Sequence, residues 1–412
     1  MLTRIEANGY KSFDPDAGIN LSLSPFTVVV GPNNSGKSNL FDLLQFVSNL
    51  SHESFKDAFT KHRGDPGDAF WAGYEPGPRQ MGVKLTFDGG TVSGNIGKIP
   101  VSGAEYKLYL EFDPRRRRLR SVGENLTILT DGDKPAWWSI ETEFDRNRGD
   151  GNVLVRSGPE RLTLETEYRL EHMERTALSQ VQDSHYGFVL DVRRALSSWR
   201  IFHLNPQAIR SPSPSISSWD LESNGAGLAT VLATLERESE FQPEYRKRFQ
   251  AIQRELHRAI PALTGVHVKD SGDGRLVLTF EQDGQVVPAR VVSDGTLRVL
   301  ALLTLAYSPE PPALIALEEP ENGIHPHLLD FVINMLRGIS RRKQDPVQVL
   351  LNSHSPYLVD LAEPHELVQA RMIDGATRFA PVSLEDRPAL RELLEQGTYT
   401  LGEVYASGSL VP

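Results

Sequence analysis

Eight consecutive residues near the start of the chain have the types and the spacing of a phosphate-binding loop. They are Gly31-Pro32-Asn33-Asn34-Ser35-Gly36-Lys37-Ser38, and they follow the apolar run 26–30. The two glycines allow backbone N–H groups to turn toward a phosphate, and Lys37 can then reach the β- and γ-phosphates. The Ser38 hydroxyl would bind Mg²⁺. The pattern therefore predicts a nucleotide triphosphate site between a strand and a helix.

A pair of carboxylates ends a second apolar run, far along the chain. Residues 314–317 read as a buried strand, and Glu318-Glu319-Pro320 follows directly. The proline makes an exposed helical position for the pair unfavourable. We expect Glu318 to hold the hydration shell of Mg²⁺, and Glu319 to orient and deprotonate the attacking water as general base.

Ser293-Asp294-Gly295 opens a helical run of apolar residues. Ser293 suits a helix N-cap, and the same helix end could instead bind a γ-phosphate. One helix and one strand separate Ser293 from Glu318 and are expected to hold this helix end away from the P-loop of the same chain. The phosphate that it binds would then belong to a second copy of the chain.

Three histidines stand close to these motifs. His354 follows the buried strand pattern of 349–351 and occupies the place of a γ-phosphate-sensing residue, although a structural role is the alternative. His325 and His327 flank Pro326, and residues two apart do not share a helix face. We interpret them as a helix start rather than a metal pair.

Composition narrows the class of protein. The 412 residues carry a net charge of −10 and no cysteine, and 39% of them are hydrophobic. No apolar run reaches the length of a membrane span, and the N-terminus lacks the apolar core of a signal peptide, so we expect a cytoplasmic protein without membrane contact. The basic run 115–118, with Arg120, is expected at a hairpin tip; a phosphate-contacting loop is the alternative.

The coarse pattern changes along the chain. Two strands are expected in 2–30, a helix in 39–50, short antiparallel strands separated by Gly, Asp and Asn in 81–168, helices in 171–260 and strands again in 266–292, followed by alternating helix and strand. This organisation predicts an ATPase lobe with a β-region at 1–168, a helical insertion at 169–262 and a second lobe at 263–412. Heptads do not persist, so no long coiled coil is expected.

Five segments resemble the ABC-type ATPase heads of the SMC, RecF and OLD kind. They are Gly-Tyr-Lys-Ser-Phe at 9–13, Gly-Lys-Ser-Asn at 36–39, Ser-Asp-Gly-Thr at 293–296, Glu-Glu-Pro-Glu-Asn-Gly-Ile-His-Pro at 318–326 and Asn-Ser-His-Ser-Pro at 352–356. Segments 205–210, 224–229 and 401–405 also look like RecF- and OLD-like ATPases. The resemblance implies an α/β fold: an ABC-type P-loop head with an antiparallel β-subdomain and an inserted helical region.

The resemblance also implies ATP and Mg²⁺ as cofactors and an ATP-sandwich homodimer. Each site would combine Lys37, Ser38, Glu318, Glu319 and His354 of one copy with Ser293 and Gly295 of the other. Glu321, Asn322 and Gly323 fall where the D-loop of the family crosses the dimer. The nucleotide contacts implied are Gly31, Asn33, Asn34, Ser35, Gly36, Lys37, Ser38, Asn39 and Lys11.

Two departures and two absences limit the resemblance. Asp294 replaces a glycine of the transporter signature, and Gln45, Gln80 and Gln207 all remain candidates for the Q-loop glutamine. No Cys-x-x-Cys hook occurs, and the stretch after His354 is too short for a TOPRIM nuclease domain. We therefore expect an ATP-hydrolysing switch of prokaryotic defence or DNA maintenance that controls a separately encoded effector, such as a nuclease. A RecF-like DNA-binding clamp, for which Arg115–Arg118 or Arg246–Arg248 would contact DNA, and a non-hydrolysing scaffold are the alternatives.

Overall fold

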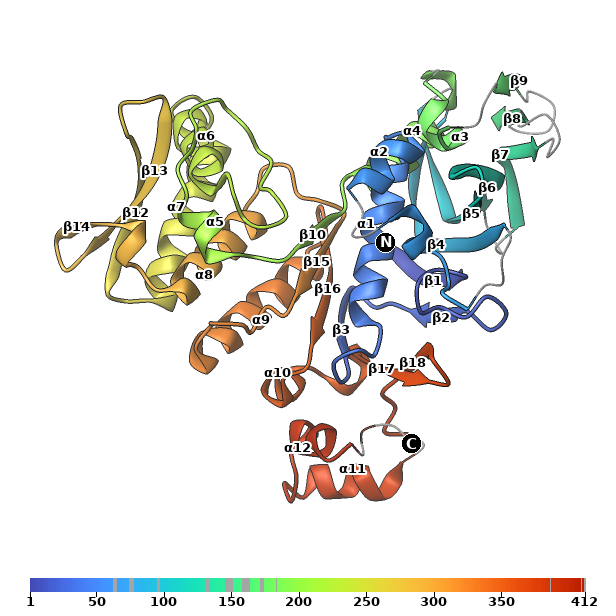
Figure 1. Ribbon diagram of the computed structural model, residues 1–412. Helices are drawn as coiled ribbons and strands as arrows, with labels where there is room; N and C mark the ends of the chain where they lie inside the picture. Colours follow the sequence, from blue (N-terminus) through green and yellow to red (C-terminus); the bar gives the residue numbers. More distant parts are fainter. Residues whose placement is uncertain are drawn as a thin grey trace. The chain divides into compact units, whose positions relative to one another are not determined.

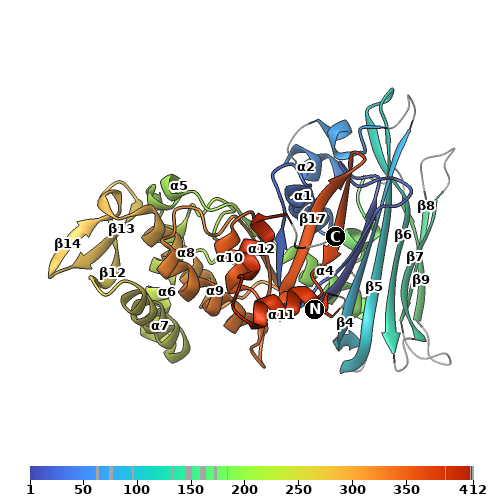
Figure 2. The same ribbon diagram turned by 90° about the horizontal axis from the view of Figure 1, so that it is seen from below.

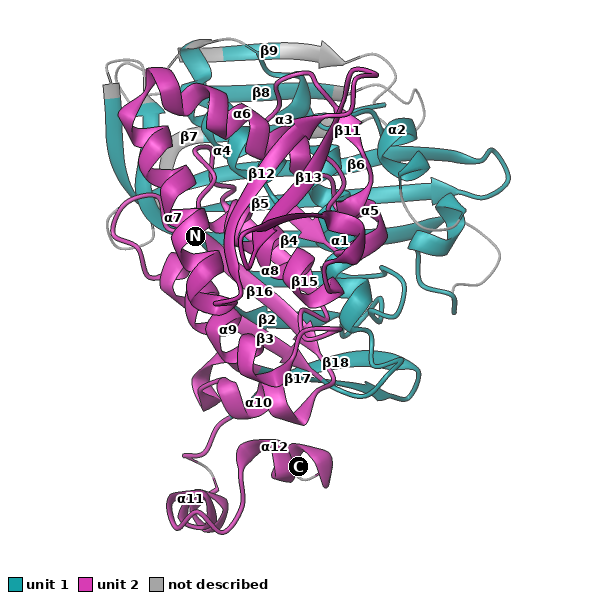
Figure 3. Cartoon of the chain, turned by 90° about the vertical axis from the view of Figure 1, so that its left-hand side faces the viewer, with its two compact units in different colours: residues 1–24, 31–199, 368–382 teal, residues 25–30, 200–367, 383–412 magenta. Residues whose placement is uncertain are grey.

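The computed structural model describes residues 1–61, 65–73, 78–94, 97–130, 134–144, 151–157, 164–170, 174–182, 184–385, 387–408 and 410. The chain forms two compact units, each assembled from separate stretches of sequence (Figure 3). Unit 1 contains residues 1–24, 31–199 and 368–382, and unit 2 contains residues 25–30, 200–367 and 383–412.

Unit 1 is built on an antiparallel sheet with the strand order β2-β1-β4-β5-β6-β7-β8-β9. The strands are β1 (Leu2–Asn8), β2 (Ile19–Ser22), β4 (Arg79–Gly94), β5 (Gly97–Asp113), β6 (Arg118–Thr130), β7 (Lys134–Phe144), β8 (Gly151–Ser157) and β9 (Leu164–Leu170). Alternate residues of β5, namely Tyr106, Leu108 and Leu110, are buried, which is the two-residue period of a strand with one covered face. Figure 2 shows these long strands running side by side.

Helices and a hairpin complete unit 1. They are α1 (Lys37–Leu50), α2 (Phe55–Thr60), α3 (Ala177–Gln180), α4 (Gly187–Ser197), the 3₁₀ turns η1 (Pro66–Ala69) and η2 (Ser184–Tyr186), and the hairpin of β17 (Leu367–Ile373) with β18 (Ala376–Pro381). Helix α1 buries Leu40, Leu44 and Val47 along one side. Its last turn is fixed to α4 because Ser48 Oγ donates to the Leu196 carbonyl (2.9 Å).

Unit 2 contains four parallel strands in the order β10 (Arg200–Phe202), β15 (Leu314–Glu318), β16 (Gln348–Ser353) and β3 (Phe26–Val30). The helices that follow or connect them are α8 (Asp294–Ala306), α9 (Pro326–Ser340), α10 (Pro356–Leu361) and the 3₁₀ turn η4 (Pro364–Glu366). Every residue of β3 and β16 is buried, as is usual for parallel strands covered on both faces. Their carboxyl ends meet at one edge, where Glu318 is in register with Asn352.

A second sheet in unit 2 joins β11 (Ser213–Pro214), β13 (Arg275–Gln282) and β12 (Leu263–Asp270), with β14 (Gln285–Pro288) paired to β13. Helices α6 (Leu228–Phe241) and α7 (Pro243–Ala259) pack against it, as Figure 1 shows. The remaining elements are α5 (Pro206–Arg210), η3 (Ala289–Val291), α11 (Pro388–Glu395) and α12 (Leu401–Ala406).

The fold class expected from the sequence is confirmed: an α/β head with an antiparallel sheet, in which the described helices reach at most 17 residues, too short for a long coiled coil. The three consecutive domains do not coincide with the two units. Helices α3 and α4, expected in the helical insertion, pack on the antiparallel sheet of unit 1. Strand β3, expected in the first lobe, belongs to the parallel sheet of unit 2. Within the described residues, none of the helices combines the length and the apolar character that a membrane span requires.

Two further expectations concern the length of the strands in unit 1 and the place of the basic run. The strands of 81–168 were expected to be short, but β4 and β5 have 16 and 17 residues. The expectation was wrong because it took glycines as turns between strands, whereas Gly90 and Gly103 lie inside the continuous strands β4 and β5. The basic run does lie at a hairpin tip, since residues 114–117 turn between β5 and β6.

Candidate functional site

The loop between β3 and α1 has the backbone of a phosphate cradle. Gly36 has a φ of 89°, and Asn34 has a φ of 66°, both in the left-handed region. A Cβ at Gly36 would lie 1.8 Å from Thr377 Oγ1, and one at Gly31 would lie 2.3 Å from the Ala370 carbonyl oxygen. Glycine is therefore required at both positions by the close approach of the β17–β18 hairpin.

The polar groups of this loop fit a bound phosphate. No side chain caps α1, whose N-terminal residue is Lys37 preceded by Gly36. Lys37 Nζ is buried and donates to the carbonyl oxygens of Gly31 (2.7 Å) and Pro32 (2.8 Å). Ser35 Oγ is buried without a hydrogen-bond partner in the described part of the chain. An uncapped helix start, a cation and a buried hydroxyl together are what a phosphate group needs.

Residues around the loop fix the first turn of α1. Asn39 Nδ2 donates to Ser12 Oγ (2.7 Å), which in turn bonds Thr377 Oγ1 (2.6 Å). Lys11 has a left-handed φ of 44°, and its amine is ion-paired with Asp42 on α1. Asn39 and Lys11 therefore hold the helix in this structure, and their contact with a nucleotide stays a prediction.

Glu318 ends β15 in unit 2, at the edge where the parallel strands finish. Its side chain is 10% exposed, and Oε2 lies 3.8 Å from His203 Nδ1, at the end of β10. The carboxylate of Glu318 and the exposed hydroxyl of Ser38 are the oxygen donors that Mg²⁺ prefers. Ser38 belongs to unit 1 and Glu318 to unit 2. Their fit to Mg²⁺ therefore rests on the chemistry of each residue taken separately.

Glu319 has an unusual backbone conformation that two bonds from one residue hold in place. Its φ of 45° lies in the left-handed region, which is uncommon for a residue with a side chain. Its backbone N–H is shared between the carbonyl oxygen of Asn352 (3.1 Å) and Oδ1 of the same residue (3.0 Å). This turns the side chain of Glu319 away from the path of a continuing strand.

The carboxylate of Glu319 is oriented at both oxygens. Asn322 Nδ2 donates to Oε2 (2.6 Å), and His354 Nδ1 lies 3.3 Å from Oε1. The side chains of Glu319 and His354 are 33% and 46% exposed, so a water molecule can reach them. A carboxylate that is held at both oxygens and still open to solvent can accept a proton from water.

The segment after Glu319 is fixed by its own bonds. Ser353 Oγ donates to Glu321 Oε1, and burial raises the pKa of the Glu321 carboxyl. The Arg298 guanidinium on α8 donates to the carbonyl of Asn322. Gly323 has a φ of 67°. The expected D-loop residues therefore lie in the chain between β15 and α9, and Asn322 contacts Arg298 of α8.

The start of α8 is a capped helix end in close contact with that segment. Ser293 is the N-cap, and its Oγ accepts from the Thr296 N–H (3.2 Å). A Cβ at Gly295 would lie 2.7 Å from the Gly323 carbonyl oxygen. Ser293 thus takes the cap role that the sequence allows, while a phosphate contact in trans remains a prediction. His325 likewise caps α9, which confirms the expected helix start.

Sequence reasoning did not find the positioning role of Asn352 or of Ser12. Asn352 reaches Glu319 because β16 and β15 are adjacent parallel strands, and its signals in the sequence are its place at the end of a buried strand and in the segment Asn-Ser-His-Ser-Pro. Two of the three candidate Q-loop glutamines are hydrogen-bonded to other side chains, because Gln45 donates to Asn49 and Gln80 donates to Glu111. The third, Gln207, lies in α5.

Parts of this chain are similar in sequence to known proteins. The family model described as "AAA domain, putative AbiEii toxin, Type IV TA system" matches residues 26–360, well over half of the chain. The "Chromosome partition protein Smc" of Mycoplasma pneumoniae is 40% identical over 87 residues, which cover 21% of this chain and 8% of that protein. The protein of that name from Halothermothrix orenii is 48% identical over 55 residues, covering 13% and 4%. The matches span only a small part of these relatives.

Solved structures share the fold over nearly the whole chain. The SmcHead bound to the C-winged helix domain of ScpA is 15% identical, with a TM-score of 0.56, over 93% of this chain and 98% of that one. The Smc head domain with an extended coiled coil, bound to the C-terminal domain of ScpA from Pyrococcus furiosus, is 15% identical with a TM-score of 0.50, over 96% and 99%. The chain belongs to the AAA family named above, and its fold resembles that of SMC head domains.

Proposed function

We propose that this protein is an ATP-hydrolysing switch, which dimerises on ATP and controls a separately encoded effector. The observation that carries the proposal is the constrained carboxylate of Glu319. Its left-handed backbone is held by Asn352, and its oxygens are met by Asn322 and His354. A non-hydrolysing scaffold has no need for such an arrangement, since strained residues persist where function requires them.

The proposed chemistry divides between the two units. In unit 1, Lys37 would release the carbonyl oxygens of Gly31 and Pro32 and bind the β- and γ-phosphates, and the Ser38 hydroxyl would hold Mg²⁺. In unit 2, Glu318 would hold the metal's water shell, and Glu319 would take the proton from the water that attacks the γ-phosphorus, while the bond to the bridging oxygen breaks and ADP leaves. His354, which lies beside the Glu319 carboxylate, would contact the γ-phosphate and keep Glu319 oriented.

A second copy is proposed to complete each site through Ser293 and Gly295. The α8 end is capped but solvent-accessible at Asp294 and exposes Ser293. Gly295 approaches Gly323, in the segment that follows Glu319. ATP that binds to the α8 end across the dimer would therefore change the position of Glu319, the proposed general base. This gives the switch a route from dimer closure to hydrolysis.

Glu319→Gln tests hydrolysis and dimerisation together. The amide keeps the bond from Asn322 or His354 but cannot take a proton, so we expect turnover to fall by about 10²-fold or more. We expect a stable ATP-bound dimer in size-exclusion chromatography with light scattering. Asn334→Ala, an exposed asparagine on α9, is the matched control and should behave as wild type. A Glu319→Gln protein that remains monomeric with ATP contradicts the dimer.

Mixing two inactive variants tests whether the sites are shared. Lys37→Ala lacks the loop cation, and Ser293→Arg blocks the α8 end; each alone should be inactive. In a mixed dimer one site receives Lys37 from one copy and Ser293 from the other. An equimolar mixture should recover about a quarter of the wild-type turnover, because half of the dimers are mixed and one of their two sites is intact. A mixture as inactive as its components rules out the shared site.

The proposal of an effector rests on the proteins that this chain resembles. The family description names a putative toxin of a type IV TA system, and a solved head of this fold is bound to a domain of another protein, ScpA. We propose a defence module in which this ATPase acts with a partner such as a nuclease. Purification from the native operon with ATP, and with Glu319→Gln, should retain that partner; recovery of the chain alone in both states would refute the module.

A DNA-binding clamp is the second candidate, favoured by the matches to chromosome partition proteins. The structure gives two of its basic candidates local roles, because Arg246 donates to the Ser239 carbonyl and Arg248 donates to the Ser308 carbonyl. Duplex binding that weakens steeply with salt would support the clamp. Affinity that does not change with salt would exclude it.

A further inference from the structure

The densest basic run of the sequence borders a pocket in unit 1 that the ATP chemistry does not use. The pocket has a volume of about 530 Å³ and lies between α2, η1 and the start of β6. Its apolar floor consists of Phe55, Phe59, Phe112 and Leu119, and its rim consists of Lys56, Thr60, Asp65, Pro66, Arg117, Arg118 and Glu174. A volume of this size is typical of a small-molecule site.

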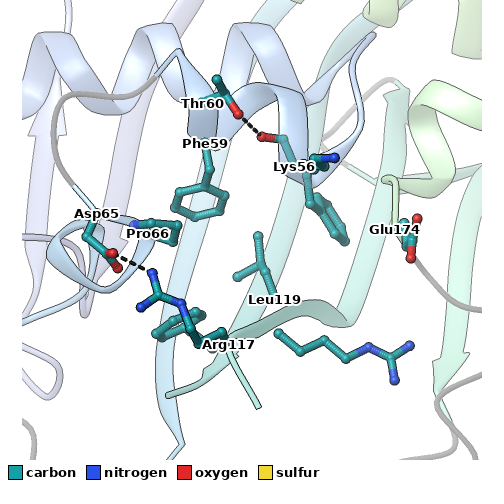
Figure 4. A pocket seen from close by; sticks show the side chains of 11 residues that line it. Lys56, Phe59, Thr60, Asp65, Pro66, Arg117, Leu119 and Glu174 are labelled. Carbon is teal, nitrogen blue, oxygen red and sulfur yellow. Dashed lines mark hydrogen bonds and ion pairs between the residues drawn. The ribbon is translucent and has the colours of Figure 1, made fainter. Parts of the chain in front are cut away.

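The floor of the pocket is preformed. Phe59 packs edge-on against Phe46 of α1, with ring centroids 4.7 Å apart, and Phe112 stacks on Phe70 at 5.7 Å. Figure 4 shows Phe59 and Leu119 pointing toward one another across the pocket, from α2 and β6. The apolar wall is therefore fixed by neighbouring rings and needs no rearrangement to receive a ligand.

The rim carries cations that the protein does not neutralise. Arg117 is paired with Asp65 (2.6 Å), as the dashed line in Figure 4 marks, and its φ of 48° is left-handed. The guanidinium of Arg118 and the amine of Lys56 make no ion pair with any described residue, and both residues are exposed. Two uncompensated cations beside an apolar floor favour an anion with an apolar body.

Glu174 narrows the class of ligand. Its carboxylate lines the same pocket, and Figure 4 shows it on the side opposite the Asp65–Arg117 pair. A carboxylate only accepts hydrogen bonds, so the end of the ligand beside it must carry donors. Figure 4 shows Lys56 on the same side of the pocket as Glu174, so the donors of the ligand lie near its anionic group. A flat apolar body whose phosphate adjoins hydroxyl donors is a nucleoside monophosphate, in which the ribose supplies those hydroxyls.

We propose that this pocket is a second nucleotide-class site, which binds a nucleoside monophosphate group with its phosphate on Lys56 and Arg118 and its base over the phenylalanine floor. The group could come from a free nucleotide or from the 5′-phosphorylated end of a single strand. The site is separate from the P-loop, whose Lys37 recognises β- and γ-phosphates. Its existence does not depend on the proposed switch.

Isothermal titration of the full chain with AMP, CMP, inorganic phosphate and a 5′-phosphorylated oligonucleotide tests the site. The variant Lys56→Ala/Arg118→Ala should weaken AMP binding by about tenfold or more, because two charge-assisted bonds are lost. Arg116→Ala is the matched control from the same turn; its side chain is 80% exposed and does not line the pocket. Lys37→Ala should bind AMP as wild type does, which separates this pocket from the P-loop.

The results distinguish a free nucleotide from a strand end as the ligand, and some of them would contradict the proposal. Binding of AMP or CMP that requires Lys56 and Arg118 assigns the pocket to free nucleotides. Binding of the oligonucleotide alone, with the same requirement, assigns it to strand ends. The proposal is overturned if no nucleotide probe binds, if Arg116→Ala loses as much affinity as the double variant, or if inorganic phosphate binds as tightly as AMP. Loss of AMP binding in Lys37→Ala would also overturn it.

Discussion

Replacing Asn352 by alanine should slow ATP hydrolysis without weakening ATP binding. Asn352 Oδ1 is one of two acceptors for the Glu319 N–H, and the other is the Asn352 carbonyl oxygen. The left-handed backbone of Glu319 costs about 1–2 kcal/mol, and each hydrogen bond contributes about 0.5–1.5 kcal/mol. The two bonds therefore nearly offset the strain.

Loss of the amide leaves only the carbonyl acceptor, so the held conformation of Glu319 is about 1 kcal/mol less favourable. Since 1.36 kcal/mol corresponds to a factor of ten, kcat should fall about three- to tenfold. The P-loop lies in another stretch of the chain, so the Kd for ATP should not change. Asn352 is buried, and the free energy of unfolding should fall by about 1–2 kcal/mol, which leaves the protein folded at the assay temperature.

The assay compares steady-state turnover with direct ATP binding in Asn352→Ala, Glu319→Gln and the double variant. If Asn352 acts through Glu319, the double variant should be no slower than Glu319→Gln alone. Asn334→Ala, which removes an exposed amide bonded to Asp330, serves as the control. A folded Asn352→Ala protein with wild-type kcat would refute the positioning role, and so would equal losses in kcat and ATP affinity.

Two further predictions concern stability. Gly295→Ala should destabilise the protein by about 1–3 kcal/mol and lower turnover, because the new Cβ meets the Gly323 carbonyl. Gly338→Ala, in the last turn of α9 and with open space around it, should stabilise the protein by about 0.5–1 kcal/mol. Thermal unfolding measures both changes. Burial raises the pKa of the Glu124 carboxyl from 4.5 to about 7, so this group's contribution to stability is present at low pH and is lost as pH rises through about 7. The free energy of unfolding should therefore decline by about 3 kcal/mol as the pH rises, and Glu124→Gln should remove most of this decline. Urea unfolding at pH 5 and pH 8 measures it. An equal decline in Glu124→Gln and in the wild type would show that Glu124 does not cause it.

Much of the site could be read from contiguous residues. The loop 31–38 and the strand that ends at Glu318 form where their patterns predict, because local backbone geometry depends on neighbours in sequence. The roles of Ser293 and His325 as helix caps follow from the same local physics. Strand lengths and unit boundaries were less predictable, since glycines inside β4 and β5 read as turns.

The sequence by itself determined where the phosphate-loop pattern and the carboxylate pair lie, and which helix and strand must present them. Only the tertiary structure decided that Asn352 holds Glu319, that Gly295 must lack a side chain beside Gly323, and that the basic turn at Arg117 borders an apolar pocket. These relations depend on strand register and on the approach of segments far apart in the chain. Neither is encoded in the spacing of a local motif, because both follow from how buried surfaces fit together.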